Sequence, residues 1–155
     1  MALGDNTLQA ARGNQNPGRN PYMVQTVLNW ATALSDKGSA LAASDVVPVI
    51  AVPKGTMVLN AGIEVDTATD GSTFTVDLGM VDADVFVDGF DATSAAAVVA
   101  QNPAAYQPVM AVADDNIDVT IATLSGGAVT SGKFRVWAVL MDCSDMGNDG
   151  VANEV

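Results

Sequence analysis

The sequence contains no histidine, and it has a single cysteine, Cys143, among its 155 residues. Without an imidazole the chain cannot build a Ser-His-Asp triad, a Cys-His pair or a histidine general base. Zinc sites with histidine ligands are excluded as well, and one thiolate cannot supply a cysteine cluster. One cysteine also excludes an intrachain disulfide, so packing alone has to hold the fold together.

Long apolar runs and basic residues are scarce too. No stretch approaches the roughly 20 residues of a membrane span, and the first residues lack the basic-then-apolar pattern of a signal peptide. The chain has 6 Lys and Arg against 18 Asp and Glu, a formal net charge of −12. Charge of that sign repels nucleic acid. We therefore expect neither a nucleic acid nor a membrane as partner.

The acidic residues are unevenly distributed along the chain. Residues 1–60 hold three carboxylates and four basic side chains, whereas residues 61–155 hold fifteen carboxylates with only Lys133 and Arg135. Two interpretations remain open. The acidic part faces solvent while the start of the chain meets an acidic partner, or the acidic surface merely keeps the protein soluble.

The composition is that of a folded domain. Hydrophobic residues make up 49% of the chain and charged residues 15%, unlike a disordered segment. The length favours one domain. Residues 1–22 are the exception, because Gly13–Pro21 combines Gly and Asn with two X-Pro steps and predicts an extended N-terminal arm. Its Leu3, Leu8 and Tyr22 favour a segment that lies on another surface, with a disordered terminus as the alternative.

Residues 22–34 fit two structures. Helical spacing with a start at Asn20-Pro21 indicates a helix. Alternation at period two instead predicts a strand whose one face contains Val24, Thr26, Leu28 and Trp30. We favour the strand because the downstream sequence is strand-like.

The downstream pattern is a series of short alternating segments. Asp70-Gly71 is typical of a hairpin turn between two of them, and residues 91–107 fit a helical turn or a long loop. The predicted strands are 46–52, 57–65, 74–80, 81–88, 109–113, 117–121 and 133–141. This spacing predicts an all-β fold, an antiparallel, jelly-roll-like β-sandwich over residues 23–142, followed by an acidic C-terminal tail over 143–155.

The last predicted strand is apolar on both faces, which is typical of a sheet centre or a subunit interface. We therefore predict an oligomer interface along this strand. Its candidate residues are Phe134, Val136, Trp137, Val139 and Met141.

Carboxylates are the only catalytic groups present in quantity. Asp82, Asp84 and Asp88 share one face of a predicted strand, and glycoside hydrolysis needs two carboxylates. A solvated strand face is the favoured interpretation. Residues 82–91 and 145–150 depart from the EF-hand pattern, although a looser calcium site between loops stays open. We accordingly predict no catalytic residue, no metal ligand and no cofactor.

Large side chains outside this pattern have a structural interpretation. Trp30 and Trp137 fit either sugar-stacking platforms or buried anchors, and we favour buried anchors. The methionines on strand patterns are expected to fill the core or an interface. These are Met57, Met80, Met110 and Met141.

The stretch Val46–Leu59 runs from an apolar strand through Pro53-Lys54-Gly55-Thr56 into a second strand. This pattern resembles small structural proteins of tailed bacteriophages. The likeness continues through Thr73–Gly79, the Asp-rich Val81–Asp91 and the closing Gly132–Ala138, and covers residues 44–142.

The resemblance implies a compact β-fold, often jelly-roll-like and often trimeric, that decorates and cements the outside of a capsid. The expected protein is thus a non-enzymatic homotrimer, made in the cytoplasm of a bacterial host and bound to the major capsid protein on the outer surface of the virion. The arm would contact capsid subunits through Leu3, Leu8, Arg12, Arg19 and Tyr22. The alternative is a head-fibre or tail-associated module that binds a receptor or glycan with acidic, calcium-binding loops.

Overall fold

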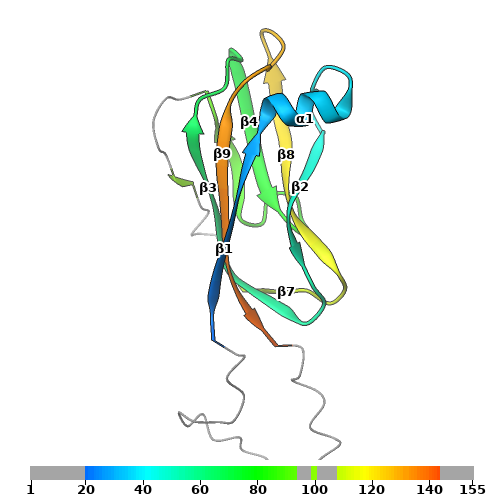
Figure 1. The fold of residues 1–155 in the computed structure, drawn as a ribbon, viewed down its shortest axis with the longest axis vertical. Helices are drawn as coiled ribbons and strands as arrows, with labels where there is room; N and C mark the ends of the chain where they lie inside the picture. The colour runs from blue at the N-terminus through cyan, green and yellow to red at the C-terminus, as the bar shows by residue number, and fades with distance from the viewer. Residues whose placement is uncertain (1–19, 94–98, 101–107, 144–155) are drawn as a thin grey trace, which may run out of the picture.

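The computed structural model describes residues 20–93, 99–100 and 108–143, which form two packed β-sheets and a short helix (Figure 1). In chain order the elements are β1 (Tyr22–Asn29), α1 (Trp30–Lys37), β2 (Val46–Val52), β3 (Thr56–Thr67), β4 (Thr73–Gly79), β5 (Val87–Asp91), β6 (Val99–Ala100), β7 (Val109–Met110), β8 (Asp115–Ser125) and β9 (Lys133–Asp142).

Sheet A has the order β1-β9-β3-β6, with β7 also pairing with β3, and sheet B has the order β2-β8-β4-β5. Every pair of neighbouring strands is antiparallel. The predicted all-β, antiparallel sandwich is confirmed. No helix in the described ranges has the length and hydropathy of a membrane span.

Period-two alternation explains why these segments are strands. In β4 the side chains of Phe74, Val76 and Leu78 are buried, while the intervening residues are more exposed. The same alternation buries Ile117, Val119 and Ile121 in β8. Since successive side chains of a strand point to opposite faces, each sheet presents one apolar face. These two faces meet and form the core.

Three aromatic rings connect the two sheets and the helix. Trp30 begins α1, and its ring lies 4.9 Å from that of Phe74 in sheet B and 5.4 Å from that of Phe134 in sheet A, edge-on in both cases. All three side chains are fully buried. The prediction of a buried anchor is confirmed for Trp30 and is wrong for Trp137, whose side chain is half-buried on β9.

Residues 22–34 contain both a strand and the start of a helix. The strand prediction is right for β1, but α1 was missed. The side chain of Asn29 accepts a hydrogen bond from the backbone N–H of Ala31 and caps the helix. Gly38 ends it in the left-handed conformation, with φ of 68°. The capping residue is therefore Asn29, well after the Asn20-Pro21 step that the helical alternative used.

The hairpin predicted at Asp70-Gly71 is wrong, because β3 belongs to sheet A and β4 to sheet B. The connection arches across the edge of the sandwich instead. Buried Thr69 donates its backbone N–H and its hydroxyl to the carbonyl of Ala92. The carboxylate of Asp70 accepts hydrogen bonds from Thr130 and from the backbone N–H of Ser131, in the β8–β9 loop. These bonds lower the pKa of Asp70 to about 2.

The strand predicted over residues 81–88 is also wrong in its first part, because residues 81–86 form a loop and β5 begins at Val87. Gly79 is the physical reason. A Cβ at this position would lie 1.9 Å from the carbonyl oxygen of Asp82, so only glycine lets the loop fold back onto β4. Pairing resumes where the backbone N–H of Phe86 donates to the carbonyl of Leu78.

Candidate binding surfaces

The residues predicted to bind a capsid lie mostly outside the described part of the chain. This applies to Leu3, Leu8, Arg12 and Arg19. Tyr22 is the first residue of β1, and 44% of its surface is exposed. The structure thus places one of the five residues at an accessible position where β1 begins.

The predicted oligomer interface on β9 needs a correction. Phe134 and Val136 point into the core and are fully buried, so they cannot contact a second chain while the protomer is folded. Trp137, Val139 and Met141 alternate with the core residues and lie half-buried on the outer side of sheet A. Only these three remain candidates for an interface.

Pairing across sheet A extends this outer surface. Met141 lies opposite Met57 of β3, and Met57 lies opposite Met110 of β7. Both of these methionines are half-buried. We call the surface made by Met57, Met110, Trp137, Val139 and Met141 the apolar face. The interpretation of these methionines as interface residues stays a prediction.

One ion pair lies beside the apolar face. The guanidinium of Arg135 in β9 donates to the carboxylate of Glu64 in β3 over 3.0 Å, and the two residues are directly opposite in the register. Both side chains are partly exposed. A pair at such exposure contributes on the order of 1 kcal/mol or less. It compensates the charges locally and leaves the apolar face without an unpaired carboxylate at this point.

Sequence reasoning missed two exposed apolar residues on β1, Met23 and Val27, which are 61% and 57% exposed. They lie opposite Val139 and Arg135 of β9 and continue the outer side of sheet A. The signal was present in the period-two pattern: the face opposite Val24, Thr26 and Leu28 holds these two residues. Assigning that face to solvent required knowing that β1 lies at the edge of the sheet.

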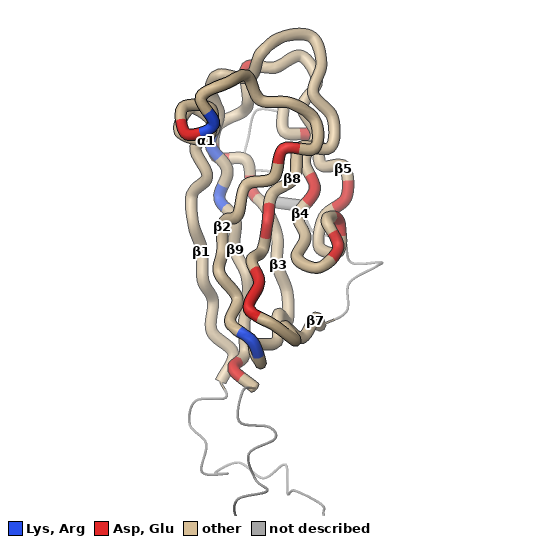
Figure 2. The backbone as a smooth tube through the Cα atoms, turned by 90° about the vertical axis from the view of Figure 1, so that its right-hand side faces the viewer, with Lys and Arg blue, Asp and Glu red and all other residues tan. Residues whose placement is uncertain are grey.

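The outer side of sheet B has the opposite character. Asp118 of β8, Asp77 of β4 and Asp91 of β5 alternate with inward-pointing core residues, and we call the surface around them the acidic face. Figure 2 shows red segments along β8 and around β4 and β5. The excess of carboxylates after residue 60 of the sequence therefore appears in the fold as an outer side of sheet B that is more acidic than the outer side of sheet A.

Asp118 lies on β8, which has a neighbouring strand of sheet B on each side. It lies opposite Pro48 on one side and Gly79 on the other. Its Oδ1 atom is buried and has no hydrogen-bond partner among the described residues. Burial, with the nearby charge of Asp115 as a smaller cause, raises the pKa of Asp118. Ionised Asp118 is thus a cost to the folded state.

The acidic residues of the β4–β5 loop do not form a catalytic pair on one strand face. Asp82 and Asp84 lie in the loop, and Asp88 is exposed on β5. Within the part of the chain that the structure describes, no three potential ligands cluster closely enough to hold a metal ion. The second EF-hand-like segment, residues 145–150, lies outside the described residues.

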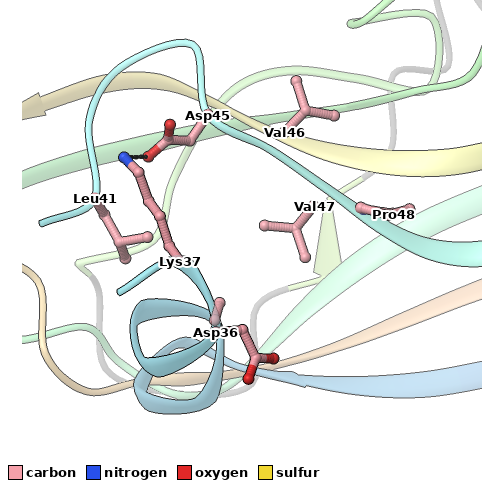
Figure 3. Close-up of a pocket in the computed structure, with 8 residues that line it drawn as sticks. Asp36, Lys37, Leu41, Asp45, Val46, Val47 and Pro48 are labelled. Atoms are coloured by element: carbon pink, nitrogen blue, oxygen red, sulfur yellow. Dashed lines mark hydrogen bonds and ion pairs between the residues drawn. The ribbon is translucent and has the colours of Figure 1, made fainter. Parts of the chain in front are cut away.

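A cavity of about 430 Å³ lies between α1 and β2 (Figure 3). Its walls include Ala33, Leu41 and Val47. At its rim, the ammonium of Lys37 pairs with the carboxylate of Asp45, and this bond holds the pKa of Asp45 below its usual value. The lining also contains Asp36, so the cavity combines apolar walls with this further carboxylate.

No protein-family model and no curated protein sequence matches this chain. Solved structures do match it. A chain of the cyanophage Pam1 capsid asymmetric unit is similar with a TM-score of 0.63 and 16% identity, over 90% of this chain and 96% of that one. A chain of the Ralstonia phage GP4 capsid is similar with a TM-score of 0.53 and 15% identity, over 88% and 89% of the two chains.

This chain has the fold of chains found in phage capsids. A third match, in the capsid of Helicobacter pylori bacteriophage KHP30, has a TM-score of 0.44 and 16% identity over 77% of this chain and 86% of that one. In the first two matches the likeness spans nearly the whole of both chains.

The raised pKa of Asp118 predicts a stabilising substitution. In wild type the unfolded chain releases this proton first, so stability falls as pH rises through the folded pKa. Asp118→Asn removes the buried charge, and at about pH 7 we expect it to raise the free energy of unfolding by about 0.5 kcal/mol, after allowance for solvent screening. Urea unfolding at several pH values measures this.

The gain should vanish at low pH, where Asp118 is protonated in both states. Asp88→Asn, at an exposed position of β5, is the matched control and should leave stability nearly unchanged. A gain for Asp118→Asn that persists unchanged at low pH would show that charge burial is not its cause.

Proposed function

We propose that this chain is a non-enzymatic structural protein of a phage particle that decorates the outer surface of the capsid and stabilises it. The observation that carries this proposal is the fold likeness over 90% of this chain and 96% of a chain in the cyanophage Pam1 capsid. A fold by itself does not specify a function. The charge distribution and the end of the sandwich at which β1 begins and β9 finishes add independent support.

The base end of the sandwich is the end where β1 starts, β9 finishes and the β2–β3 turn lies (Figure 1). The backbone N–H of Cys143, just after β9, donates to the carbonyl of Gly55 in that turn, which also contains Lys54. The sequence of residues 1–19 continues from this end and contains Arg12 and Arg19. In the proposal, the base end faces the shell and the arm binds the major capsid protein.

The acidic face supports an outward orientation. Its carboxylates repel nucleic acid, so a position inside a filled capsid would place like charges against each other. Asp77, Asp91 and Asp118 are tolerated best where water screens them. In the proposal these residues face solvent on the outside of the particle.

The proposed homotrimer uses the apolar face. Half-buried Met141 lies beside Met57, which in turn lies beside Met110, and Val139 and Trp137 continue the same outer side along β9. Aromatic residues and methionine are enriched at protein interfaces. Packing this surface between copies would bury apolar area away from water.

The jelly-roll form of the sandwich is part of the same proposal. The described strands lie in sheets of five and four, and two of them, β6 and β7, span two residues each. Two packed antiparallel sheets are the architecture of a double-sheet jelly roll.

Deleting residues 2–21 should abolish binding to undecorated capsids, because the proposed contacts of Leu3, Leu8, Arg12 and Arg19 are removed. Capsid occupancy after sedimentation of mixed samples measures the effect. Removing residues 144–155 is the control for terminal truncation and should leave occupancy unchanged. Equal occupancy for the arm deletion would refute the role of the arm. Glycan binding without any effect on capsid stability would favour the receptor-binding alternative.

Trp137→Lys should dissociate the trimer, because it places a charged ammonium in the apolar face. Light scattering at micromolar concentration should then report the mass of one chain. Thr120→Lys, a half-buried position on the outer side of sheet B, is the matched control and should keep the mass of wild type. Wild-type protein that is itself monomeric under these conditions would contradict a trimer in solution.

A further inference from the structure

β1 is an edge strand of sheet A. It pairs with β9 over all eight of its residues without a register shift, and no strand of the described residues lies on its other side. The backbone N–H and C=O groups of such an edge are a template for a further strand. Edge strands of natural proteins usually carry charges, proline or bulges that prevent such pairing.

The other edge strands carry features that discourage pairing. β2 contains Pro48 beside a register shift, and β5 carries exposed Asp88 and Asp91 beside another. β6 and β7 span two residues each. By contrast β1, with the sequence YMVQTVLN, has no charge, no proline, no glycine and no bulge. It is the edge that is best able to accept a strand.

Exposed apolar side chains gather on the same strand. Among the described residues, three of the six large hydrophobic side chains that are exposed belong to β1: Tyr22, Met23 and Val27. Met23 and Val27 lie on the outer side of the sheet, with exposed Gln25 between them. An edge that combines free backbone groups with exposed apolar side chains is typical of a pairing site.

We propose that β1 pairs antiparallel with β1 of a second copy of this chain, with Gln25 on the two-fold axis. In such a pair, residues directly opposite each other share one face of the sheet. Placing Gln25 opposite its own counterpart sets Met23 opposite Val27 of the second copy, and does so twice. The two exposed side chains then cover each other as cross-strand pairs. A two-fold axis at Thr26 would instead place Val27 opposite Gln25, so Met23 and Val27 would not cover each other.

Charge favours a second copy as the occupant. Each copy has a net charge of −12, so copies can approach only through a surface without exposed carboxylates. β1 meets this condition. Its neighbours in β9 add no uncompensated carboxylate, since Val27 lies opposite Arg135, which is paired with Glu64, and Asn29 lies opposite Lys133. The border of the edge therefore keeps the positive charge of Lys133, which complements a strongly acidic partner chain.

This two-fold contact is isologous and uses the edge of sheet A, next to the apolar face proposed for the trimer. It does not depend on binding to a capsid. On a particle, it would join neighbouring copies or trimers into a continuous layer. Because an edge contact buries little area, we expect it to be transient for isolated protein, so the experiment uses covalent capture.

The test is disulfide capture in a Cys143→Ala background, which removes the chain's own thiol. Across an antiparallel pair, opposed Cα atoms are about 4.5–5.5 Å apart, within the range for a disulfide. Gln25→Cys should therefore link two copies on mild oxidation. Met23→Cys is also at an exposed position, but its counterpart would lie about 14 Å away along the strands, and it should not link. Ala51→Cys, exposed on protected edge β2, should not link either.

A second set of variants tests the axis itself. The double variant Met23→Cys/Val27→Cys should link in this register. Adding Gln25→Glu would place two carboxylates opposite each other, so it should lower the yield of linked chains severalfold, and salt should restore it. Gln25→Asn, the uncharged control, should leave the yield unchanged. Circular dichroism verifies that each variant is folded.

The proposal is overturned if Met23→Cys links as readily as Gln25→Cys, or if neither links. Trp137→Lys added to Gln25→Cys separates this inference from the proposed trimer. Linking should persist in that combination, because the two contacts use different residues. Loss of linking there would overturn the independent two-fold contact, whereas failure to bind capsids would leave the result of disulfide capture unaffected.

Discussion

The contact of Trp30 with Phe74 and Phe134 holds the three parts of the molecule together. One ring belongs to the helix, one to sheet B and one to sheet A, and all are fully buried. Edge-on aromatic pairs contribute about 0.5–1.5 kcal/mol each beyond the burial of area. Since a chain with one cysteine has no intrachain disulfide, this packing keeps the sheets face to face and leaves their outer sides available.

Those outer sides are unlike. Sheet A presents the apolar face, which contains Trp137, Val139 and three methionines and is bordered by Arg135. Sheet B presents carboxylates, among them Asp118, whose pKa is raised by burial. An apolar face suits contact with protein, and an acidic face suits water. The proposed decoration role uses this difference directly: copies associate through sheet A, and sheet B faces outward.

Much of the sandwich could be predicted from alternation, and the errors have physical causes. Residues 46–52 match β2 in both bounds, and Pro53 and Gly55 explain why that strand ends sharply at Val52. Helix α1 was missed because its start depends on the cap of Asn29. The hairpin and the 81–88 strand failed because local pattern does not reveal whether a chain changes sheets or folds back at Gly79. On β9, only pairing shows that Phe134 faces the core and Trp137 the outside.

Electron cryomicroscopy of a phage particle that contains this chain would show where the chain lies. We expect density for the sandwich on the outside of the shell, with the base end near Tyr22 and Lys54 toward the capsid and the acidic face of Asp77, Asp91 and Asp118 toward solvent. A reconstruction in which this chain is absent from the shell, or in which its acidic face packs against capsid subunits, would contradict it.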